Sequence, residues 1–396
     1  MARRLRSGDL FPTDHPIPAS QMIGRSADVK RVATTVMAGT NLVIAGPRRT
    51  GKTSVCEAAL TLARSKGMYT VAVDLFRIPT AAQLAEALVT GTIANRSAIR
   101  RLLHRTRRAG RAVLGVAEQS AEIKIKSELG EDVEIAFRPE LAARDPDKYL
   151  TYALELPNRI ARIDGKHVIV FFDEFQELVN PRKPYGDPDR LTKRMRSVFQ
   201  RSDEVSFLFA GSVESVMRDL FAPESKAFAQ FGSFYTLAPI EADAWRVGLA
   251  ERFAADGCEA DADALDRLIE LGELHPRATM LIAQKTHLVS IMLNERSIDL
   301  ALVTQGLALA LEGDAAVNEQ AVERIRRAHK LGLVVARRIA LGDEPYRELD
   351  DREAHRAVTA LRRGGFIEQP RPRRWRIVNP LLRRYLADLE PAPIAR

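Results

Sequence analysis

Two short stretches of the chain carry residue types at spacings that fit phosphate and metal chemistry. The first, residues 46–54, reads GPRRTGKTS and matches the pattern G-x-x-x-x-G-K-[ST]. In this spacing successive backbone N–H groups wrap a phosphate at the start of a helix, and Gly51 allows the close approach. Lys52 would reach the β- and γ-phosphates of a nucleotide, and the Thr53 hydroxyl would bind Mg²⁺. We therefore predict that ATP or ADP is held by Gly46, Pro47, Arg48, Arg49, Thr50, Gly51, Lys52, Thr53 and Ser54.

The second stretch is the pair Asp173-Glu174, which follows the apolar run HVIVFF. A buried strand that ends in two carboxylates places them at the carboxyl edge of a sheet, where α/β proteins bind ligands. Asp173 would hold Mg²⁺, and Glu174 would orient or deprotonate an attacking water. The simpler alternative is a strand that ends in a solvated acidic turn.

A third position, Ser212, follows the apolar run VSFLFA and Gly211. A hydroxyl at the end of a strand can lie near the γ-phosphate or the attacking water, so Ser212 is a candidate sensor. It could equally cap a helix over residues 213–220, and the two roles are compatible.

These positions need a sheet to bring them together, and the hydrophobic pattern predicts one. Five apolar or β-rich runs alternate with helical patterns, which indicates a parallel sheet with right-handed crossovers. The runs are residues 41–45, 69–75, 167–172, 205–210 and 233–237. After Pro239 the strands stop, and residues 242–311 read as a bundle of helices.

The stretch from residue 81 to residue 163 is long for a crossover. We expect an inserted helical subdomain there, with a β-hairpin over residues 122–125 and 133–137. Between residues 96 and 111 the stretch holds seven arginines and no acid. This run is either a second basic surface or the solvated face of a helix.

The motifs together resemble the archaeal-type ATPase family of the AAA+/STAND P-loop ATPases. The matching residues are GPRRTGKTS at 46–54, FFDEFQEL at 171–178 and FAGS at 209–212. The resemblance implies an α/β fold with strand order 5-1-4-3-2, a helical lid and a C-terminal winged helix, with ATP and Mg²⁺ as ligands. It also implies ATPase or nucleotide-switch behaviour, in a chain divided at about residues 1–240, 241–314 and 315–396.

The resemblance assigns further residues outside the two main motifs. Ile23, Gly24 and Arg25 would lie beside the adenine. Arg277 of the lid would contact the γ-phosphate, although it also follows Pro276, so a plain helix-start position is the alternative. Relatives often carry an arginine before the fifth strand, whereas residues 221–234 hold Lys226 as their only cation. This departure argues against an arginine-finger mechanism in a ring.

The excess of positive charge lies at the C-terminal end. The chain has a formal net charge of +8, and residues 321–396 hold 18 Lys and Arg against 10 Asp and Glu. Residues 351–363 predict an amphipathic helix, and residues 366–378 read as a two-stranded wing before a last helix. We expect DNA contacts from Arg352, Arg356, Arg362, Arg363, Arg371, Arg373 and Arg374. The alternative is a module that packs on the ATPase core or binds a protein.

Composition narrows the class of protein further. The chain has two cysteines in 396 residues, too few for a disulfide framework. It has no apolar run of the roughly 18–20 residues that a membrane span needs, so we expect a cytoplasmic protein. Three functions fit these observations: an ATP-hydrolysing protein that contacts DNA, a slow nucleotide switch, and an adaptor whose winged helix binds a protein partner. The oligomeric state is left open.

Overall fold

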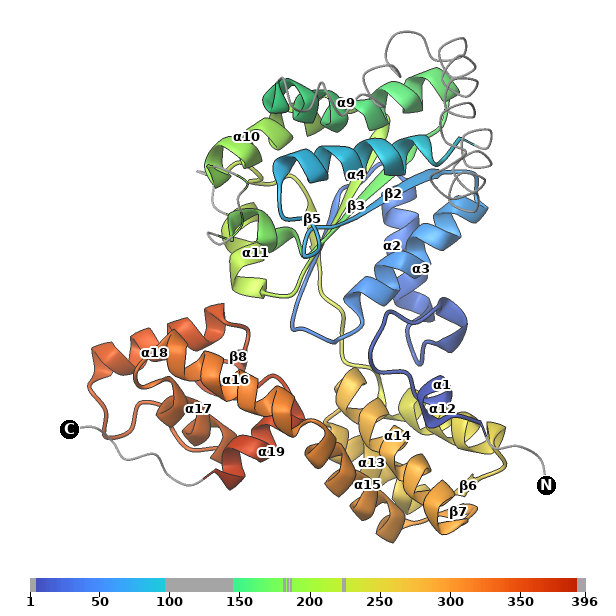
Figure 1. The fold of residues 1–396 in the computed structure, drawn as a ribbon, viewed down its shortest axis with the longest axis vertical. Helices are drawn as coiled ribbons and strands as arrows, with labels where there is room; N and C mark the ends of the chain where they lie inside the picture. The colour runs from blue at the N-terminus through green and yellow to red at the C-terminus, as the bar shows by residue number, and fades with distance from the viewer. Residues whose placement is uncertain are drawn as a thin grey trace, which may run out of the picture.

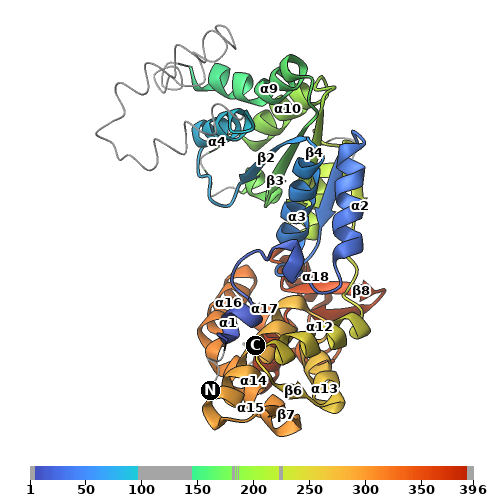
Figure 2. The ribbon, with the colours of Figure 1, turned by 90° about the vertical axis from the view of Figure 1, so that its right-hand side faces the viewer.

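The computed structural model describes residues 5–96, 145–180, 183, 185, 187–222 and 226–389. Figure 1 shows a sheet between layers of helices at the top, a bundle of helices below it, and a smaller C-terminal part beside the bundle. The view in Figure 2, turned by 90°, shows the sheet standing above the other two parts.

The sheet has five parallel strands in the order β2-β3-β4-β1-β5, which confirms the predicted order 5-1-4-3-2. The strands are β1 (Leu42–Ala45), β2 (Tyr69–Asp74), β3 (Val168–Asp173), β4 (Val205–Gly211) and β5 (Ser233–Tyr235). Because all five run the same way, their carboxyl ends meet at one edge, and Asp74 lies opposite Asp173 there.

Both faces of the sheet are buried because its strands turn apolar side chains alternately to each side. One face, with Leu42 and Ile44, packs on α2 (Ser26–Met37) and α3 (Lys52–Ser65). The other face, with Val43, packs on α4 (Ala81–Ile93), α9 (Pro146–Asp164), α10 (Pro188–Phe199), α11 (Glu214–Phe221) and the short 3-10 helix η3 (Phe175–Val179). Phenylalanines fill this second layer, and the rings of Phe199 and Phe207 stack with their centroids 4.0 Å apart.

The ends of the expected insertion belong to this layer. Leu84 of α4 and Leu150 of α9 lie in the same buried cluster as the strands, and Arg96 pairs with Asp164. The expected hairpin and the arginine-rich run after Arg96 lie outside the described residues.

The bundle contains α12 (Ala242–Ala255), α13 (Ala262–Gly272), α14 (Pro276–Leu293) and α15 (Leu300–Gly313). The prediction that strands stop after Pro239 was wrong in one detail, because β6 (Glu259–Ala260) and β7 (Ser297–Ile298) form a two-residue parallel pair. This pair ties the loop after α12 to the loop after α14.

The N-terminal segment packs on the bundle and also contacts the helix layer of the sheet, where the Ile17 backbone N–H donates to the Ser54 hydroxyl of α3 at 3.1 Å. It contains the single turn α1 (Ser7–Leu10) and the 3-10 turn η1 (Ala19–Gln21). Phe11 is fully buried against Phe253, and the backbone N–H of Leu5 donates to the Asp256 carboxylate at 2.6 Å. The start of this segment is therefore held by the bundle helices, while Met22 at its end packs against the cluster of α2, α3 and the sheet.

The C-terminal part contains α16 (Ala315–Ala328), α17 (Gly332–Leu341), α18 (Asp351–Arg363), β8 (Ile367–Arg371), β9 (Arg374–Ile377) and α19 (Pro380–Asp388). Its helices share a buried cluster of their own, into which α18 turns Ala357, Val358 and Leu361. Helix α19 also docks on the bundle, where Arg383 donates to Glu273 at 2.8 Å and Leu381 is buried.

Both cysteines, Cys56 and Cys258, are buried and unpaired. Among the described residues no single helix is long and apolar enough to cross a membrane, and α15 with α16 meets that test only as a pair bent by 53°.

Candidate functional site

A cavity of about 560 Å³ lies between the carboxyl edge of the sheet, the bundle and the N-terminal segment. Its apolar lining includes four residues packed in the bundle cluster, namely Ile23, Ile240, Trp245 and Met280. Its charged lining consists of Arg25, Arg48, Arg49, Lys52, Glu174 and Arg277, together with Asp14 and His15. An apolar wall beside a basic group of side chains fits a ligand with a flat ring and phosphates.

The loop over residues 46–51 connects β1 to α3 and lines this cavity. Gly51 has φ 89°, a left-handed conformation that favours glycine, and it immediately precedes the first turn of α3. The Thr50 hydroxyl donates to the Pro47 carbonyl at 2.9 Å, which closes the loop on itself. The N–H groups at the start of α3 therefore border the cavity, the arrangement that binds anions.

Lys52 is almost fully buried at the start of α3. Its ammonium donates to the Pro47 carbonyl at 2.5 Å. Burial lowers the pKa of Lys52 to about 8, although the nearby carboxylates of Glu174 and Asp173 oppose the shift. At pH 7 the side chain is still mostly cationic, and it is poorly solvated, so a phosphate would be a strong partner.

Thr53 and Asp173 meet where α3 passes the end of β3. The Thr53 hydroxyl donates to Asp173 Oδ2 at 2.7 Å. Burial raises the pKa of Asp173 to about 6, while the hydrogen bond from Thr53 works against that shift. A hydroxyl and a carboxylate in contact supply the oxygen ligands that Mg²⁺ prefers, so these two residues fit the ion.

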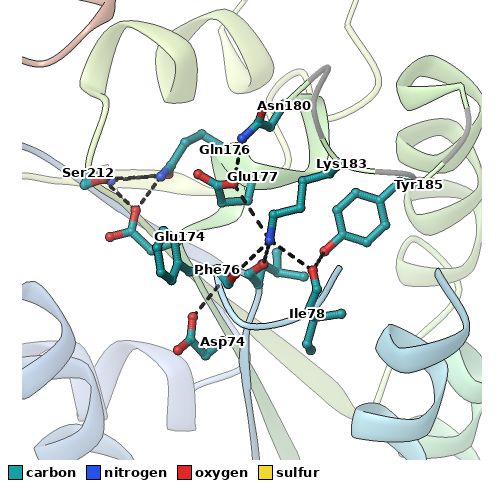
Figure 3. Close-up of polar contacts among 11 residues, drawn as sticks. Asp74, Phe76, Ile78, Glu174, Gln176, Glu177, Asn180, Lys183, Tyr185 and Ser212 are labelled. Carbon is teal, nitrogen blue, oxygen red and sulfur yellow. Dashed lines mark hydrogen bonds and ion pairs between the residues drawn. The ribbon is translucent and has the colours of Figure 1, made fainter. Parts of the chain in front are cut away.

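Glu174 sits at the centre of a polar network that Figure 3 shows. Its Oε2 accepts hydrogen bonds from the Ser212 hydroxyl at 2.6 Å and from the Gln176 amide. Gln176 also donates to the Ser212 hydroxyl at 3.3 Å, and Arg48 Nε donates to the same oxygen at 3.2 Å. The network holds the Glu174 carboxylate between the loop over residues 46–51 and the end of β4.

The helix-cap alternative for Ser212 was wrong. The N-cap residue of α11 is Val213, and no side chain caps that helix. The Ser212 hydroxyl donates to Glu174 instead. Ser212 directly follows the last residue of β4, so it lies at the carboxyl edge of the sheet beside Glu174. Gln176 was not among the predicted site residues, although it lies two positions after Glu174 in the quoted motif.

The loop after β2 forms another wall that the sequence did not predict. Lys183 donates to the carbonyls of Leu75, Phe76 and Ile78 at 2.9, 2.7 and 3.0 Å, and Tyr185 donates to Ile78 at 2.5 Å (Figure 3). These bonds hold the loop in place, and Phe76 lines the cavity with 62% of the residue exposed.

Ile23, Gly24 and Arg25 lie together between the sheet and the bundle. Gly24 has φ 63°, and a Cβ there would come within 2.8 Å of Ile240. Arg25 is buried and donates to Asp28 at 2.9 Å and to the Ala238 carbonyl at 2.7 Å. The guanidinium thus ties the start of α2 to the end of the sheet, while Ile23 lines the apolar wall.

Arg277 lies at the second position of α14, as the helix-start alternative requires, and its side chain also lines the cavity. Its Nη1 and Nη2 donate to the two carboxylate oxygens of Asp314 at 2.6 and 2.8 Å. Both side chains are buried, with 10% of Arg277 and 5% of Asp314 exposed. Sequence reasoning missed Asp314, which no local pattern singles out.

The seven arginines predicted to contact DNA lie in the C-terminal part, away from the cavity lining, and all are exposed. Arg356 is 70% exposed and pairs with Glu353 at 2.9 Å. The other six, namely Arg352, Arg362, Arg363, Arg371, Arg373 and Arg374, make no ion pair with another described residue.

No protein-family model and no curated protein matches the sequence. Among solved structures, the chain is similar to a Walker-type ATPase of Pyrococcus abyssi, with a TM-score of 0.69 and 15% identity over 95% of this chain and 99% of that one. It is also similar to the ORC2 protein of Aeropyrum pernix in ADPNP-ADP complexes, with a TM-score of 0.57 and 13% identity over 95% of each chain. The fold is therefore that of the AAA+ P-loop ATPases, as the sequence motifs predicted.

Proposed function

We propose that the protein binds ATP with Mg²⁺ in the described cavity and hydrolyses it. The observation that carries the proposal is the 2.7 Å contact between Thr53 and Asp173 beside the start of α3. It joins a hydroxyl that follows the loop over residues 46–51 to a carboxylate at the end of β3, which lies one strand away from β1 in the sheet. This pair is suited to Mg²⁺ on a bound phosphate.

Residues in the cavity and at the adjoining edge of the sheet then have distinct parts in the reaction. The N–H groups of residues 46–53 bind the phosphates, Lys52 neutralises their charge, and Thr53 with Asp173 holds the metal ion. The bound Mg²⁺ supplies charge stabilisation for the terminal phosphate. Glu174 orients or deprotonates the attacking water, and Ser212 and Gln176 hold its carboxylate in place.

The adenine lies against the wall that Ile23 and Trp245 line. The nucleotide complexes of the structurally similar ORC2 protein support ATP and ADP as ligands of this fold. Trp245 is buried in the bundle, and its indole N–H has no hydrogen-bond partner among the described residues. Trp245 therefore contributes an apolar surface to this wall.

Calorimetry with ATP or ADP in the presence of Mg²⁺ tests nucleotide binding directly. We expect heat from both nucleotides and release of inorganic phosphate from ATP. No heat with either nucleotide would overturn the proposal.

We propose further that the C-terminal part is a winged helix that contacts DNA. The order of helices α16, α17 and α18 followed by the hairpin β8-β9 and α19 supports this reading. Arginines stand free on α18 and at the tip of the hairpin, at Arg371, Arg373 and Arg374, where they can reach phosphates.

A gel-shift titration against duplex DNA at several salt concentrations tests this contact. Binding that weakens steeply with salt supports it, since phosphate contacts release counterions. Absence of DNA binding at physiological salt, together with a protein that co-purifies with the chain, would instead select the adaptor role.

The second candidate is a slow nucleotide switch in the cytoplasm. It is favoured by residues 221–234, in which Lys226 is the only cation where relatives often carry an arginine. This candidate predicts purified protein that carries ADP and turns over ATP slowly until a partner is added.

A further inference from the structure

The pair Arg277–Asp314 joins the cavity to the junction between the bundle and the C-terminal part. Arg277 lines the cavity together with Arg49 and Lys52. Asp314 ends α15 and begins α16, which are bent by 53° at this residue. A single buried ion pair therefore connects the nucleotide site to a bend 37 residues further along the chain.

The Asp314 carboxylate does not cap α16, although Asp314 is the N-cap residue of that helix. Aspartate at a helix N-cap normally accepts a hydrogen bond from the first turn, yet Asp314 makes no such bond to α16. One turn later, Asn318 is 1% exposed, and neither its amide nitrogen nor its oxygen has a partner among the described residues. The first turn of α16 therefore receives no hydrogen bond from the Asp314 side chain, because Arg277 binds both of its carboxylate oxygens.

A terminal phosphate is the natural competitor for Arg277. Guanidinium binds phosphate and carboxylate in the same bidentate geometry, and a phosphate brings more negative charge. Arg49 lines the same cavity as Arg277. Burial and the positive charge of Arg277 lower the pKa of Arg49, while the negative charge of Asp314 raises it. An anion in the cavity would therefore relieve repulsion between the two arginines and take one of them from Asp314.

We propose that Asp314 is a positioning residue that holds Arg277 until the γ-phosphate of ATP takes the guanidinium, and that the freed carboxylate then caps α16. The bend between α15 and α16 thereby differs between ATP and ADP. This inference rests on the proposed nucleotide site. It adds a way in which the bound nucleotide changes the bend that leads to the C-terminal part.

The test compares Asp314→Asn, Asp314→Glu and Arg277→Gln with the unsubstituted chain. Affinities for ADPNP and ADP are measured by competition with a fluorescent ADP. We expect Asp314→Asn to raise the preference for ADPNP over ADP by about 5- to 10-fold, since Arg277 is released. Asp314→Glu keeps the charge and should restore most of the original preference, and Asp314→Asn should have no effect when Arg277→Gln is already present. Asp266→Asn is the matched control, because Asp266 pairs with Arg246 at the exposed surface of the bundle.

A second measurement follows the bend itself, so that a variant that fails to fold does not decide the matter. Spin labels at Gln305→Cys and Glu319→Cys, both exposed, report the distance between α15 and α16. We expect this distance to differ between ADPNP and ADP in the unsubstituted chain, and to take the ADPNP value with either nucleotide in Asp314→Asn.

The outcomes separate this inference from the function on which it rests. If both nucleotides bind and Lys52→Ala abolishes binding, but Asp314→Asn leaves the preference unchanged, the role of Asp314 is overturned and the nucleotide site stands. A label distance that is the same with both nucleotides overturns the link to the bend. If neither nucleotide binds, both proposals fall.

Discussion

The cavity proposed to bind the nucleotide and the arginine surface of the C-terminal part differ in how far their charges are exposed to water. At the cavity and the adjoining end of β3, Lys52, Asp173 and Arg277 are largely buried, and burial shifts the pKa values of Lys52 and Asp173 to about 8 and about 6. On the C-terminal part, Arg356 is 70% exposed even though it pairs with Glu353. A buried charge depends on a few fixed partners, so one substitution has a large effect, whereas exposed charges are screened and act as a sum.

The largest effect is expected from replacing Glu174, the residue that we propose activates the attacking water. Glu174→Gln should lower the rate of ATP hydrolysis by roughly 10²–10⁴-fold, because it removes the general base. Nucleotide affinity should stay within about 2-fold, since the phosphate loop is untouched. Phosphate release and calorimetry measure the two quantities, and Glu214→Gln on the exposed face of α11 is the control. Normal turnover in Glu174→Gln would remove Glu174 from the reaction.

The next effect concerns binding. Lys52→Ala should weaken ATP and ADP binding by about 100-fold or more, because it removes a desolvated cation from the phosphates. Lys66→Ala, at the exposed end of the same helix, should leave affinity unchanged. Fluorescent-nucleotide titration measures both variants. Equal affinities in the two would contradict the assignment of the phosphate loop.

A pH titration sharpens the contrast between buried and exposed groups. Mg²⁺ needs Asp173 as a carboxylate, and the pKa of Asp173 is raised to about 6. The proton therefore competes with the metal as the pH falls through 6, and Mg²⁺ affinity should drop about 10-fold between pH 8 and pH 5. An aspartate at its ordinary pKa of 3.8 would stay ionised over most of that range.

The measurement is a Mg²⁺ titration of the protein saturated with fluorescent ADP at each pH. Asp173→Asn is the reference, because protonation of the nucleotide itself affects both proteins alike. A wild-type affinity that stays constant down to pH 5 would show that Asp173 does not hold the metal.

The smallest effect per residue belongs to the exposed arginines. Replacing Arg371, Arg373 and Arg374 together with alanine should lower the slope of log affinity for DNA against log salt by about 2 to 3 units. Any one of them alone should change affinity only a few-fold at physiological salt. Arg326, Arg327 and Lys330, which are exposed elsewhere on the C-terminal part, form the control triple. Equal loss in both triples would mean that the hairpin tip is not a preferred contact.

Much of the site could be predicted because its residues are local in the sequence. The loop over residues 46–51 joins β1 directly to α3, and Asp173 and Glu174 lie at the end of β3, so pattern and spacing place them at one edge. The sheet order followed from the resemblance of these motifs. Ser212 was predicted at the correct edge of the sheet, but its alternative role as a helix cap was wrong. The two roles were hard to separate because β4 ends one residue before Ser212 and the N-cap of α11 comes one residue after it.

Other residues could not be predicted, because distant segments decide their partners. Phe76 faces the cavity because Lys183 and Tyr185, more than a hundred residues later, hold its loop. Phe11 packs in the bundle because helices much later in the chain supply the apolar and aromatic side chains that bury it, among them Phe253. Nothing in the local pattern around these positions distinguishes them from ordinary loop residues.

By itself, the sequence determined the phosphate loop, the carboxylates at the sheet edge and the apolar strands that carry them, because these depend on neighbouring residues and on periodicity. The tertiary structure alone decided that Ser212 bonds to Glu174, and that Arg277 finds Asp314 across the junction of two helices. The physical reason is burial: a charge removed from water takes whichever partner the packed chain brings within reach, and that partner need not be near it in the sequence.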